Sequence, residues 1–307
     1  MKNVRWWVSL WILIPLALGG CVSGVGRQEL AEEYFNLGNA FFELGDFDRS
    51  YRYYSQAIAL TDTFPAAGYN LVRLLIDRGD LQRADELLGD LRREDPESLL
   101  LMETEAYLRV RRDDHEAASV LYRQVLQESP GRVRVAYNLG LLEWMQGNYG
   151  EARDVLVENR LFVENDDEYL WLLADVLYRN DQEEAALIDL DRYFLLVRDD
   201  APKVLRLLQR YVEWGFYLAA LEAAEQPPAA LLRDHDYHFV RAVAHLRGGS
   251  DFSTGQAAFA QAIEQGFSDV ARIDELLQHL PSDEAEVLRE LVPTDPAQDP
   301  LTDSEGP

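Results

Sequence analysis

Residues 31–62 read AEEYFNLGNAFFELGDFDRSYRYYSQAIALTD, and this stretch decides the fold. Two apolar patterns with helical spacing flank a turn at Gly45. In the second pattern Ser50, Tyr54 and Ala57 recur at steps of four and three residues, which places them on one face of a helix. A helical hairpin of this kind buries one side against itself and needs a neighbour to cover its other apolar side. We therefore expect further copies along the chain.

The hairpin recurs every 34 residues. The turn position carries Gly or Asp, at Gly45, Gly79, Asp113, Gly147, Asp181 and Gly215. Seven residues before each turn stand Gly38, Val72, Ala106, Gly140, Ala174 and Leu208. Five residues after each turn stand Ser50, Ala84, Ala118, Ala152, Ala186 and Ala220. Small side chains at a helix crossing let two helices approach closely, so the pattern predicts six stacked hairpins.

The C-terminal part departs from this register. A seventh copy slips by one residue, with matches at Asp251, Phe252, Gly255, Phe259, Ala262 and Ile263. Pro227 and Pro228 are expected to break the second helix of the sixth copy. Residues 268–291 are predicted to form two short capping helices, because the last repeat of a stack has no neighbour. Residues 292–307 are rich in Pro and Asp and are expected to be a disordered acidic tail.

This 34-residue pattern resembles the tetratricopeptide repeat (TPR). The matches in the first copy are Leu37, Gly38, Phe41, Ser50, Tyr54 and Ala57, and those in the fourth are Leu139, Gly140, Gly147, Tyr149 and Ala152. The resemblance implies an all-α fold, a TPR-type α-solenoid in which helix-turn-helix hairpins form a right-handed superhelix. It implies about seven repeats over residues 30–267.

The N-terminus has the order of a secretory signal. Lys2 and Arg5 accompany an apolar run over residues 6–18. That run is shorter than the roughly 20 residues that a spanning helix needs. The sequence Leu18-Gly19-Gly20-Cys21 then resembles the lipobox of bacterial lipoproteins.

That second resemblance implies that residues 1–20 are a signal peptide and that Cys21 becomes a lipidated N-terminus. Residues 21–29 would form a short tether that holds the protein outside the cytoplasm, in the cell envelope. Val22 stands where many Gram-negative lipoproteins of the inner membrane have aspartate. We therefore expect the periplasmic face of the outer membrane. An ordinary signal peptide or an uncleaved short anchor remains the alternative.

Charge and composition exclude several functions. Lys and Arg number 29 against 55 Asp and Glu, and the net charge of −26 opposes binding to nucleic acid or to an anionic membrane surface. The single cysteine allows no intramolecular disulfide and no cysteine-based zinc site. Phosphate loops, nucleophile elbows and HExxH are absent from the sequence.

The histidines do not change this interpretation. His238 and His245 share a helix face but lie about 10 Å apart along it, too far to hold one ion. His235 and His238 remain a possible pair of ligands, but partly exposed histidines near acids such as Asp236 are common, and we interpret them as structural. We therefore expect neither an enzyme nor a cofactor, apart from the covalent lipid.

The TPR resemblance also implies a partner-binding groove, lined by the first helix of each repeat. Carried onto this chain, its residues are Phe35, Asn39, Phe42, Tyr69, Arg73, Tyr107, Arg134, Tyr137, Trp144, Trp171 and Tyr178. Aromatic side chains of this kind are enriched at binding hot spots. The alternative is that the rings pack against adjacent repeats or that a C-terminal helix fills the groove.

One subgroup of TPR domains binds acidic chain ends through a clamp of lysines and asparagines. Asn39 and Asn70 occupy two of the clamp positions, but Phe35 and Leu100 replace the lysines. Capture of a chaperone tail is therefore not expected.

The sequence as a whole predicts a membrane-anchored extracytoplasmic scaffold or adaptor. It would bind a protein or peptide segment in its aromatic groove and serve in envelope assembly. Two alternatives remain open. One is a ligand-binding component that hands a small apolar molecule to a transporter, and the other is a self-assembling structural protein that forms homo-oligomers.

Overall fold

A computed structural model describes residues 26–61, 64–163, 165–249 and 251–293. The signal peptide, Cys21 and the expected tail from residue 294 onward lie outside these residues. The described part is all-α, as predicted, with no strand. Its first seven helices are α1 (Arg27–Glu43), α2 (Phe47–Leu60), α3 (Pro65–Asp77), α4 (Leu81–Glu94), α5 (Leu99–Arg111), α6 (His115–Glu128) and α7 (Val133–Met145).

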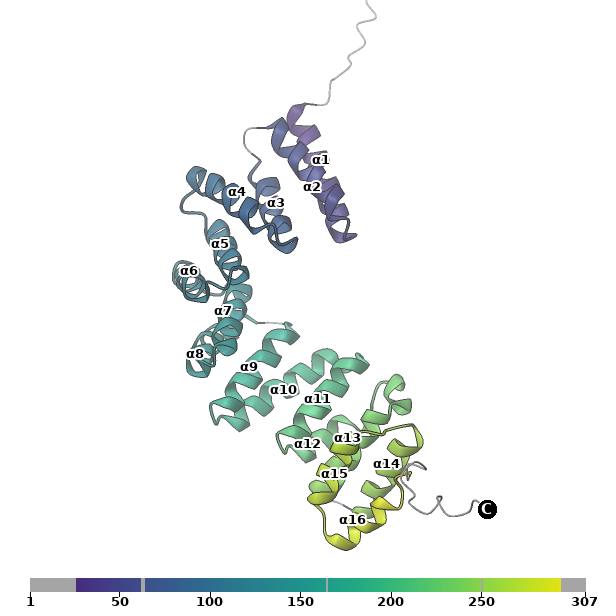
Figure 1. The fold of residues 1–307 in the computed structure, drawn as a ribbon. Helices are drawn as coiled ribbons and strands as arrows, with labels where there is room; N and C mark the ends of the chain where they lie inside the picture. The colour runs from purple at the N-terminus through teal and green to yellow at the C-terminus, as the bar shows by residue number, and fades with distance from the viewer. Residues whose placement is uncertain (1–25, 62–63, 164, 250, 294–307) are drawn as a thin grey trace, which may run out of the picture. The chain divides into compact units, whose positions relative to one another are not determined.

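The remaining helices continue the alternation to the C-terminus. They are α8 (Tyr149–Asn159), η1 (Arg160–Phe162), α9 (Asp167–Arg179), α10 (Glu183–Val197), α11 (Ala201–Glu213), α12 (Tyr217–Ala223), η2 (Ala229–Arg233), α13 (His235–Arg247), α14 (Phe252–Glu264), α15 (Val270–Gln278) and α16 (Ser282–Arg289). Odd-numbered helices up to α13 are called first helices below, and their even-numbered partners second helices. Figure 1 labels them along the chain.

Two compact units make up the chain, divided between Leu121 and Tyr122 inside α6. The N-terminal unit holds α1 to α5, and the C-terminal unit holds α7 to α16. Within the first, α1 packs on α2, α2 on α3 and α3 on α4. Within the second, α7 packs on α8, α9 on α10, and α13 on α14. Each unit is therefore a stack of helical hairpins.

The predicted turns share one backbone conformation. Gly45 has φ +71° and Asp113 has φ +60°, which is the left-handed region, and the four other predicted turn residues agree. The next residue closes the turn: the Asp46 N–H donates to the Phe41 carbonyl at 2.9 Å. This is the helix-ending Schellman bond, which satisfies a carbonyl that the helix leaves open. The 34-residue period is thus the distance along the sequence between successive copies of this turn, which ends each first helix.

The seventh copy slips by one residue as predicted, and the structure locates where the slip begins. Gly249 has φ +68° and lies 34 residues after Gly215, so this turn keeps the register. The second helix α14 begins at Phe252, three residues after the turn glycine instead of two. The slip therefore arises between Gly249 and Phe252 and affects α14 and the helices after it.

Close helix approach explains the small residues. A Cβ added to Gly38 would lie 2.5 Å from the Tyr54 ring, and one added to Gly140 would lie 2.6 Å from Leu156. In the first hairpin the buried Ser50 hydroxyl donates to the Gly38 carbonyl at 2.9 Å. The predicted crossing positions are therefore core positions.

Two second helices end early, and the same device caps both. The α8 helix stops at Asn159 and α12 at Ala223, before the predicted break at the proline pair. The Tyr169 hydroxyl donates to the Leu156 carbonyl at 2.7 Å. Two repeats later the Tyr237 hydroxyl donates to the Ala224 carbonyl at 2.9 Å. In both repeats a tyrosine from the next first helix thus donates a hydrogen bond to a backbone carbonyl that has no partner within the shortened helix.

The two short C-terminal helices α15 and α16 are present as predicted. Leu276 and Leu288 are buried in a cluster that also contains Phe239 and Phe259. The α16 helix packs on α14 and α15, so it covers the end of the stack. Within the part of the chain that the structure describes, no helix has the length and apolar character to cross a membrane.

Candidate binding face

The residues predicted to line a groove belong to first helices, and each unit is described by itself. Their side chains and the neighbours that contact them are called the first-helix face. Most of the predicted members are half-buried; Arg134 is exposed and Trp171 is buried.

In the N-terminal unit, Asn39 is the centre of a neutral hydrogen-bond network. Its Oδ1 accepts from the Tyr54 hydroxyl at 2.7 Å and from Asn70 Nδ2 at 2.8 Å. These bonds join α1 to its own second helix and to the next first helix. Burial raises the pKa of Tyr54, so this hydroxyl stays protonated and can donate.

A small pocket of about 160 Å³ adjoins this network. Its lining is Asn39, Phe42, Glu43, Tyr54, Asn70 and Arg73. The Arg73 guanidinium lies 5.9 Å from the centroid of the Tyr69 ring. The predicted residues Asn39, Phe42 and Arg73 are therefore brought together, with Tyr69 beside them.

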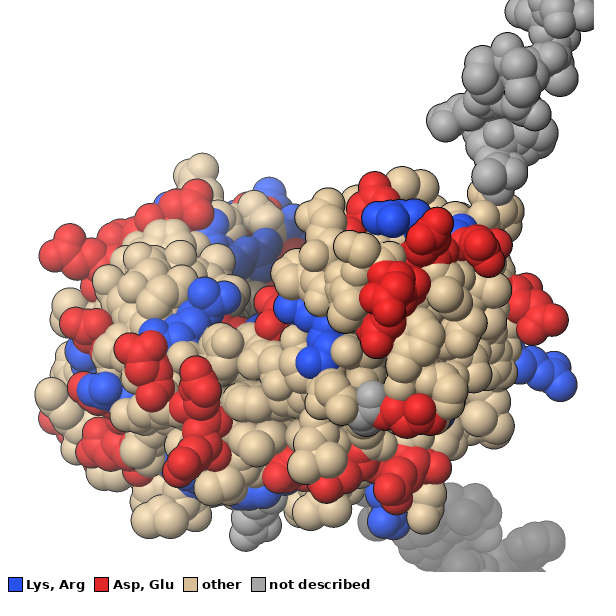
Figure 2. All heavy atoms as spheres, turned by 90° about the horizontal axis from the view of Figure 1, so that it is seen from below, with Lys and Arg blue, Asp and Glu red and all other residues tan. Residues whose placement is uncertain are grey.

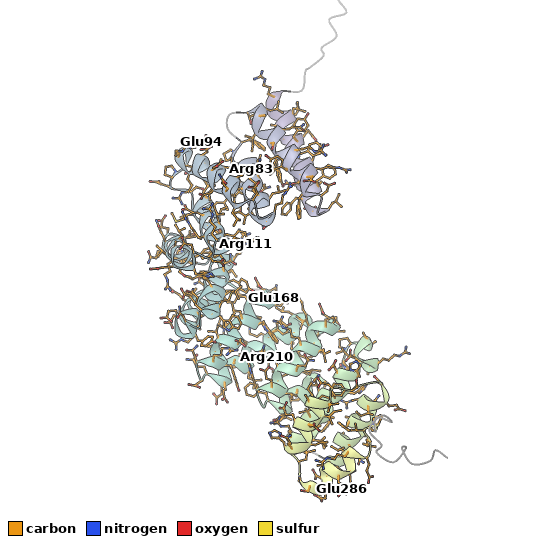
Figure 3. All side chains as sticks on the ribbon, viewed as in Figure 1. Arg83, Glu94, Arg111, Glu168, Arg210 and Glu286 are labelled. Atoms are coloured by element: carbon orange, nitrogen blue, oxygen red, sulfur yellow. The ribbon has the colours of Figure 1, made fainter. Side chains whose placement is uncertain are left out.

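The other predicted residues of this unit pack against rings or acids. Phe35 contacts Phe64 edge-on, with ring centroids 5.3 Å apart. The Tyr107 hydroxyl donates to Asp77 at 3.2 Å and accepts from Arg111 Nη1 at 3.3 Å. Arg111, labelled in Figure 3, thus positions Tyr107 at the end of α5.

In the C-terminal unit, Asp175 is the centre of a charged network. Its side chain is 6% exposed. Its Oδ2 accepts from Trp144 Nε1 at 2.6 Å and from Arg179 Nε at 2.7 Å. Its Oδ1 accepts from Arg210 Nη1 at 2.5 Å. Asp175 therefore links three consecutive first helices, α7, α9 and α11, and Figure 3 labels Arg210 on the last of them.

Aromatic rings and guanidinium groups surround this carboxylate. Arg206 lies 3.8 Å and Arg210 5.0 Å from the Trp171 ring centroid. Tyr178 stacks on Trp214 with centroids 4.0 Å apart and planes 2° from parallel. Trp171 is 7% exposed, so packing against neighbours describes it better than an open contact surface. Trp144, Tyr178 and Tyr137 keep part of each ring at the surface.

The sixth repeat supplies three residues that the sequence pattern did not single out: Arg206, Arg210 and Trp214. The available signal was a pair of arginines one helical turn apart in α11, followed by an aromatic residue at its end. Arg206 is 45% exposed through its side chain, and its one ion pair among described residues is to Glu168 at 3.7 Å. It is therefore the most accessible cation of this cluster.

The histidine group has no metal geometry. His238 is 2% exposed, and its Nε2 lies 3.1 Å from the Leu232 carbonyl. Among the described residues His235 forms one ion pair, with Asp236 at 3.5 Å. No group of three potential ligands that would hold an ion is found among the described residues.

Acidic side chains cover much of the surface seen in Figure 2, with Lys and Arg scattered among them. Several arginines of the C-terminal unit form ion pairs with acids. Arg160 and Arg192 both bind the fully buried Asp189, at 2.7 and 3.2 Å. Burial nevertheless raises the pKa of Asp189, although the two guanidinium groups oppose this shift.

Comparisons with known proteins identify the repeats. Two family models, each described as tetratricopeptide repeat, match residues 41–102 and 103–158. A solved structure of Pseudomonas aeruginosa pilF is 18% identical with a TM-score of 0.56, over 69% of this chain and 96% of that chain. A tetratricopeptide repeat protein from Parabacteroides merdae is 17% identical with a TM-score of 0.49, over 82% and 98%. No curated protein matches the chain.

Proposed function

Because this chain is a tetratricopeptide-repeat protein, and therefore a protein-interaction scaffold, we propose that it captures a protein or peptide segment on its first-helix face while a lipid on Cys21 holds it in the cell envelope. The observation that carries the binding proposal is the Asp175 network of the C-terminal unit. It holds the half-exposed Trp144 ring on α7 and joins α7, α9 and α11, while Tyr178 on α9 stacks on Trp214 just after α11.

Fixed rings favour binding because little side-chain entropy remains to be lost on association. Trp144 is held through its indole N–H, and Tyr178 is held by its stack on Trp214. Their remaining surface offers apolar contact area in a set orientation. A partner segment that lies across α7, α9 and α11 would contact these rings in turn.

Arg206 supplies the polar part of this proposed site. Its guanidinium carbon lies 3.8 Å from the Trp171 ring centroid, and 45% of its side chain is exposed, so its N–H groups can reach a partner. Its pair with Glu168 is partly exposed on both sides, so it contributes little and is readily exchanged. A carboxylate of the partner segment would replace Glu168 there.

The anchor rests on the N-terminal pattern alone. Residues 18–21 read Leu-Gly-Gly-Cys after an apolar run, and the tether of residues 21–29 would keep the repeats close to the bilayer. An acidic molecule is repelled by an anionic membrane surface, so the lipid would provide the attachment. We place the protein on the periplasmic face of the outer membrane, in envelope assembly.

Photocrosslinking tests the binding face. Benzoylphenylalanine replaces Tyr137 on α7 in the full-length protein, and Ile188 on α10 serves as the matched position on a second helix. Both side chains reach the surface, and Ile188 is 55% exposed. We expect a discrete crosslinked partner from position 137 and not from position 188. Crosslinks from position 188 alone would place the partner elsewhere.

Membrane fractionation tests the anchor separately. Cys21→Ser should move the protein from the membrane fraction to the soluble fraction, and mass spectrometry of the wild-type N-terminus should show acyl chains. Unchanged membrane association of Cys21→Ser would refute the lipid anchor and leave the binding face untouched.

A further inference from the structure

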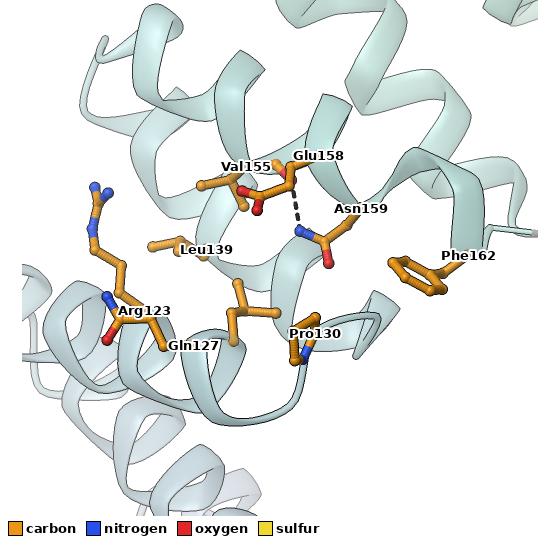
Figure 4. Close-up of a pocket in the computed structure, with 9 residues that line it drawn as sticks. Arg123, Gln127, Pro130, Leu139, Val155, Glu158, Asn159 and Phe162 are labelled. Carbon is orange, nitrogen blue, oxygen red and sulfur yellow. Dashed lines mark hydrogen bonds between the residues drawn. The ribbon is translucent and has the colours of Figure 1, made fainter.

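A second pocket lies in the C-terminal unit between the second helices α6 and α8, away from the first-helix face. Its volume is about 550 Å³. Figure 4 shows its lining residues, which are Arg123, Leu126, Gln127, Pro130, Leu139, Val155, Glu158, Asn159 and Phe162. The aliphatic members Leu126, Leu139 and Val155 come from α6, α7 and α8, and the pocket therefore combines apolar and polar lining groups.

The early end of α8 builds one wall of this pocket. Asn159 is 5% exposed, and its Nδ2 donates to the Val155 carbonyl at 2.9 Å (Figure 4). Its Oδ1 accepts from the Gly131 N–H at 3.3 Å. The chain then turns so that Phe162 lies over Gly131, where an added Cβ would come within 2.9 Å of the ring. The ring stays 53% exposed.

The two charged residues that line the pocket, Arg123 and Glu158, differ in whether an ion pair already neutralises them. Arg123 binds the buried carboxylate of Glu143 at 2.7 Å, so its charge is already neutralised. Glu143 also accepts from Asn148 at 2.9 Å, which fixes the pair. The exposed Glu158 side chain has no hydrogen bond or ion pair to any described residue. The charge that this pocket offers to a partner is therefore negative.

Two arginines near the pocket, on α8 and in η1, are paired with acids. Arg153 on α8 pairs with its neighbour Asp154 at 2.6 Å. Arg160 in η1 pairs with the buried Asp189. A negative carboxylate, an exposed aromatic ring and aliphatic lining residues therefore occur together, with these arginines occupied.

We propose that this pocket binds a lysine or arginine side chain, with an adjacent apolar residue, from a basic segment of a partner protein. The aliphatic stem would lie along Leu126 and Val155, as long cationic side chains do on apolar surfaces. The cationic head would meet the Glu158 carboxylate and the face of Phe162. The pocket is larger than one side chain, so the apolar neighbour enters beside the stem.

Fluorescence anisotropy with a defined probe tests this assignment. The probe is a short fluorescein-labelled peptide of alternating Leu and Arg, and versions with Gln or Glu in place of Arg are its references. The full-length protein should bind the Arg peptide most tightly and the Glu peptide least. Glu158→Gln and Phe162→Ala should each weaken binding of the Arg peptide by about fivefold. Gln127→Trp, which fills the pocket, should weaken it at least about tenfold.

Matched variants separate the pocket from the general acidity of the protein. Glu151→Gln removes the same charge from the same helix, and Leu161→Ala removes an apolar side chain that is 93% exposed beside Phe162. Neither residue lines the pocket, so both variants should bind like wild type. Equal losses in Glu158→Gln and Glu151→Gln, or unchanged binding in Gln127→Trp, would overturn the proposal. Circular dichroism checks that each variant is folded.

Discussion

Asn39 and Asp175 occupy the same position of their repeats, four periods of 34 residues apart. In the N-terminal unit Asn39 accepts two hydrogen bonds from neutral groups. In the C-terminal unit Asp175 accepts three, two of them from guanidinium groups. The repeats therefore accommodate either a neutral or a charged residue at this position, because both residues accept hydrogen bonds that join one first helix to the next.

The networks around Asn39 and Asp175 differ in which side chains remain accessible to a partner. Around Asn39 a small pocket remains, lined by amides, Phe42 and Arg73. Around Asp175 the rings of Trp144 and Tyr178 are fixed, with Arg206 beside them. The repeat therefore determines the positions of the side chains that could bind a partner. The residue at the centre of each hydrogen-bond network determines whether those side chains are neutral or charged and how firmly they are held.

The largest expected effect comes from breaking the charged centre. Asp175→Ala leaves Arg210, which is 21% exposed through its side chain, without its main partner. Loss of one member of a buried pair costs about 3–5 kcal/mol. Asn39→Ala removes neutral bonds only and should cost about 1–2 kcal/mol. Urea unfolding measures both, by tryptophan fluorescence for Asp175→Ala and by far-UV circular dichroism for Asn39→Ala.

Asp154→Ala is the control, because this exposed carboxylate pairs only with its neighbour Arg153. It should change stability by less than about 0.5 kcal/mol. Equal losses of unfolding free energy in Asp175→Ala and Asn39→Ala would contradict the expectation that the charged network contributes more stability than the neutral one.

Alkaline pH should unfold the C-terminal unit first. In the N-terminal unit burial raises the pKa of one tyrosine, Tyr54. In the C-terminal unit burial raises the pKa values of five tyrosines, which are Tyr137, Tyr169, Tyr193, Tyr211 and Tyr237. For Tyr193 the pKa rises from 10.0 to about 12. The folded state therefore favours the neutral phenol, and its stabilising effect is complete below pH 10 and is lost as the pH rises toward 12.

For Tyr193 alone the loss amounts to about 3 kcal/mol. The tryptophans of the described residues, Trp144, Trp171 and Trp214, all lie in the C-terminal unit. Their fluorescence should therefore change at lower pH than the ellipticity of the N-terminal hairpins. Coincident transitions in both signals would contradict unequal sensitivity of the two units.

The tyrosine caps of the shortened second helices should give a smaller effect. Tyr169→Phe and Tyr237→Phe each remove a hydroxyl that donates to a helix carbonyl, at 2.7 and 2.9 Å. Each should cost about 1–1.5 kcal/mol in urea unfolding. Tyr34→Phe, at a more exposed position of α1, should cost much less and serves as the control.

The smallest effect should be a gain in stability, and it should be the same in both units. Asp113 and Asp181 hold the left-handed turn conformation at φ +60° and +57°. Glycine adopts this conformation without steric cost, so Asp113→Gly and Asp181→Gly should each stabilise the protein by up to about 1 kcal/mol. Thermal unfolding measures the change. A loss of stability in either variant would show that the aspartate side chain contributes more than the turn strain costs.

The helices and turns were predictable because they depend on local conformation. A residue such as Gly45 must adopt positive φ, and Gly38 must admit Tyr54, so both leave a periodic trace in the sequence. The Asp175 network was not predictable in the same way. Two of its three donors lie 31 and 35 residues away, and pairing across repeats depends on side-chain packing that a period does not record. The break at Asn159 lacks proline, and so it left no helix-stopping signal.

Hydrogen exchange with and without the bound partner tests the first-helix face most directly. The partner identified by crosslinking at position 137 is added to the full-length protein, and exchange is followed helix by helix. The account predicts slower exchange in α7, α9 and α11, which Asp175 links, and unchanged exchange in α8 and α10. Protection confined to α8 and α10 would contradict a partner site on the first helices.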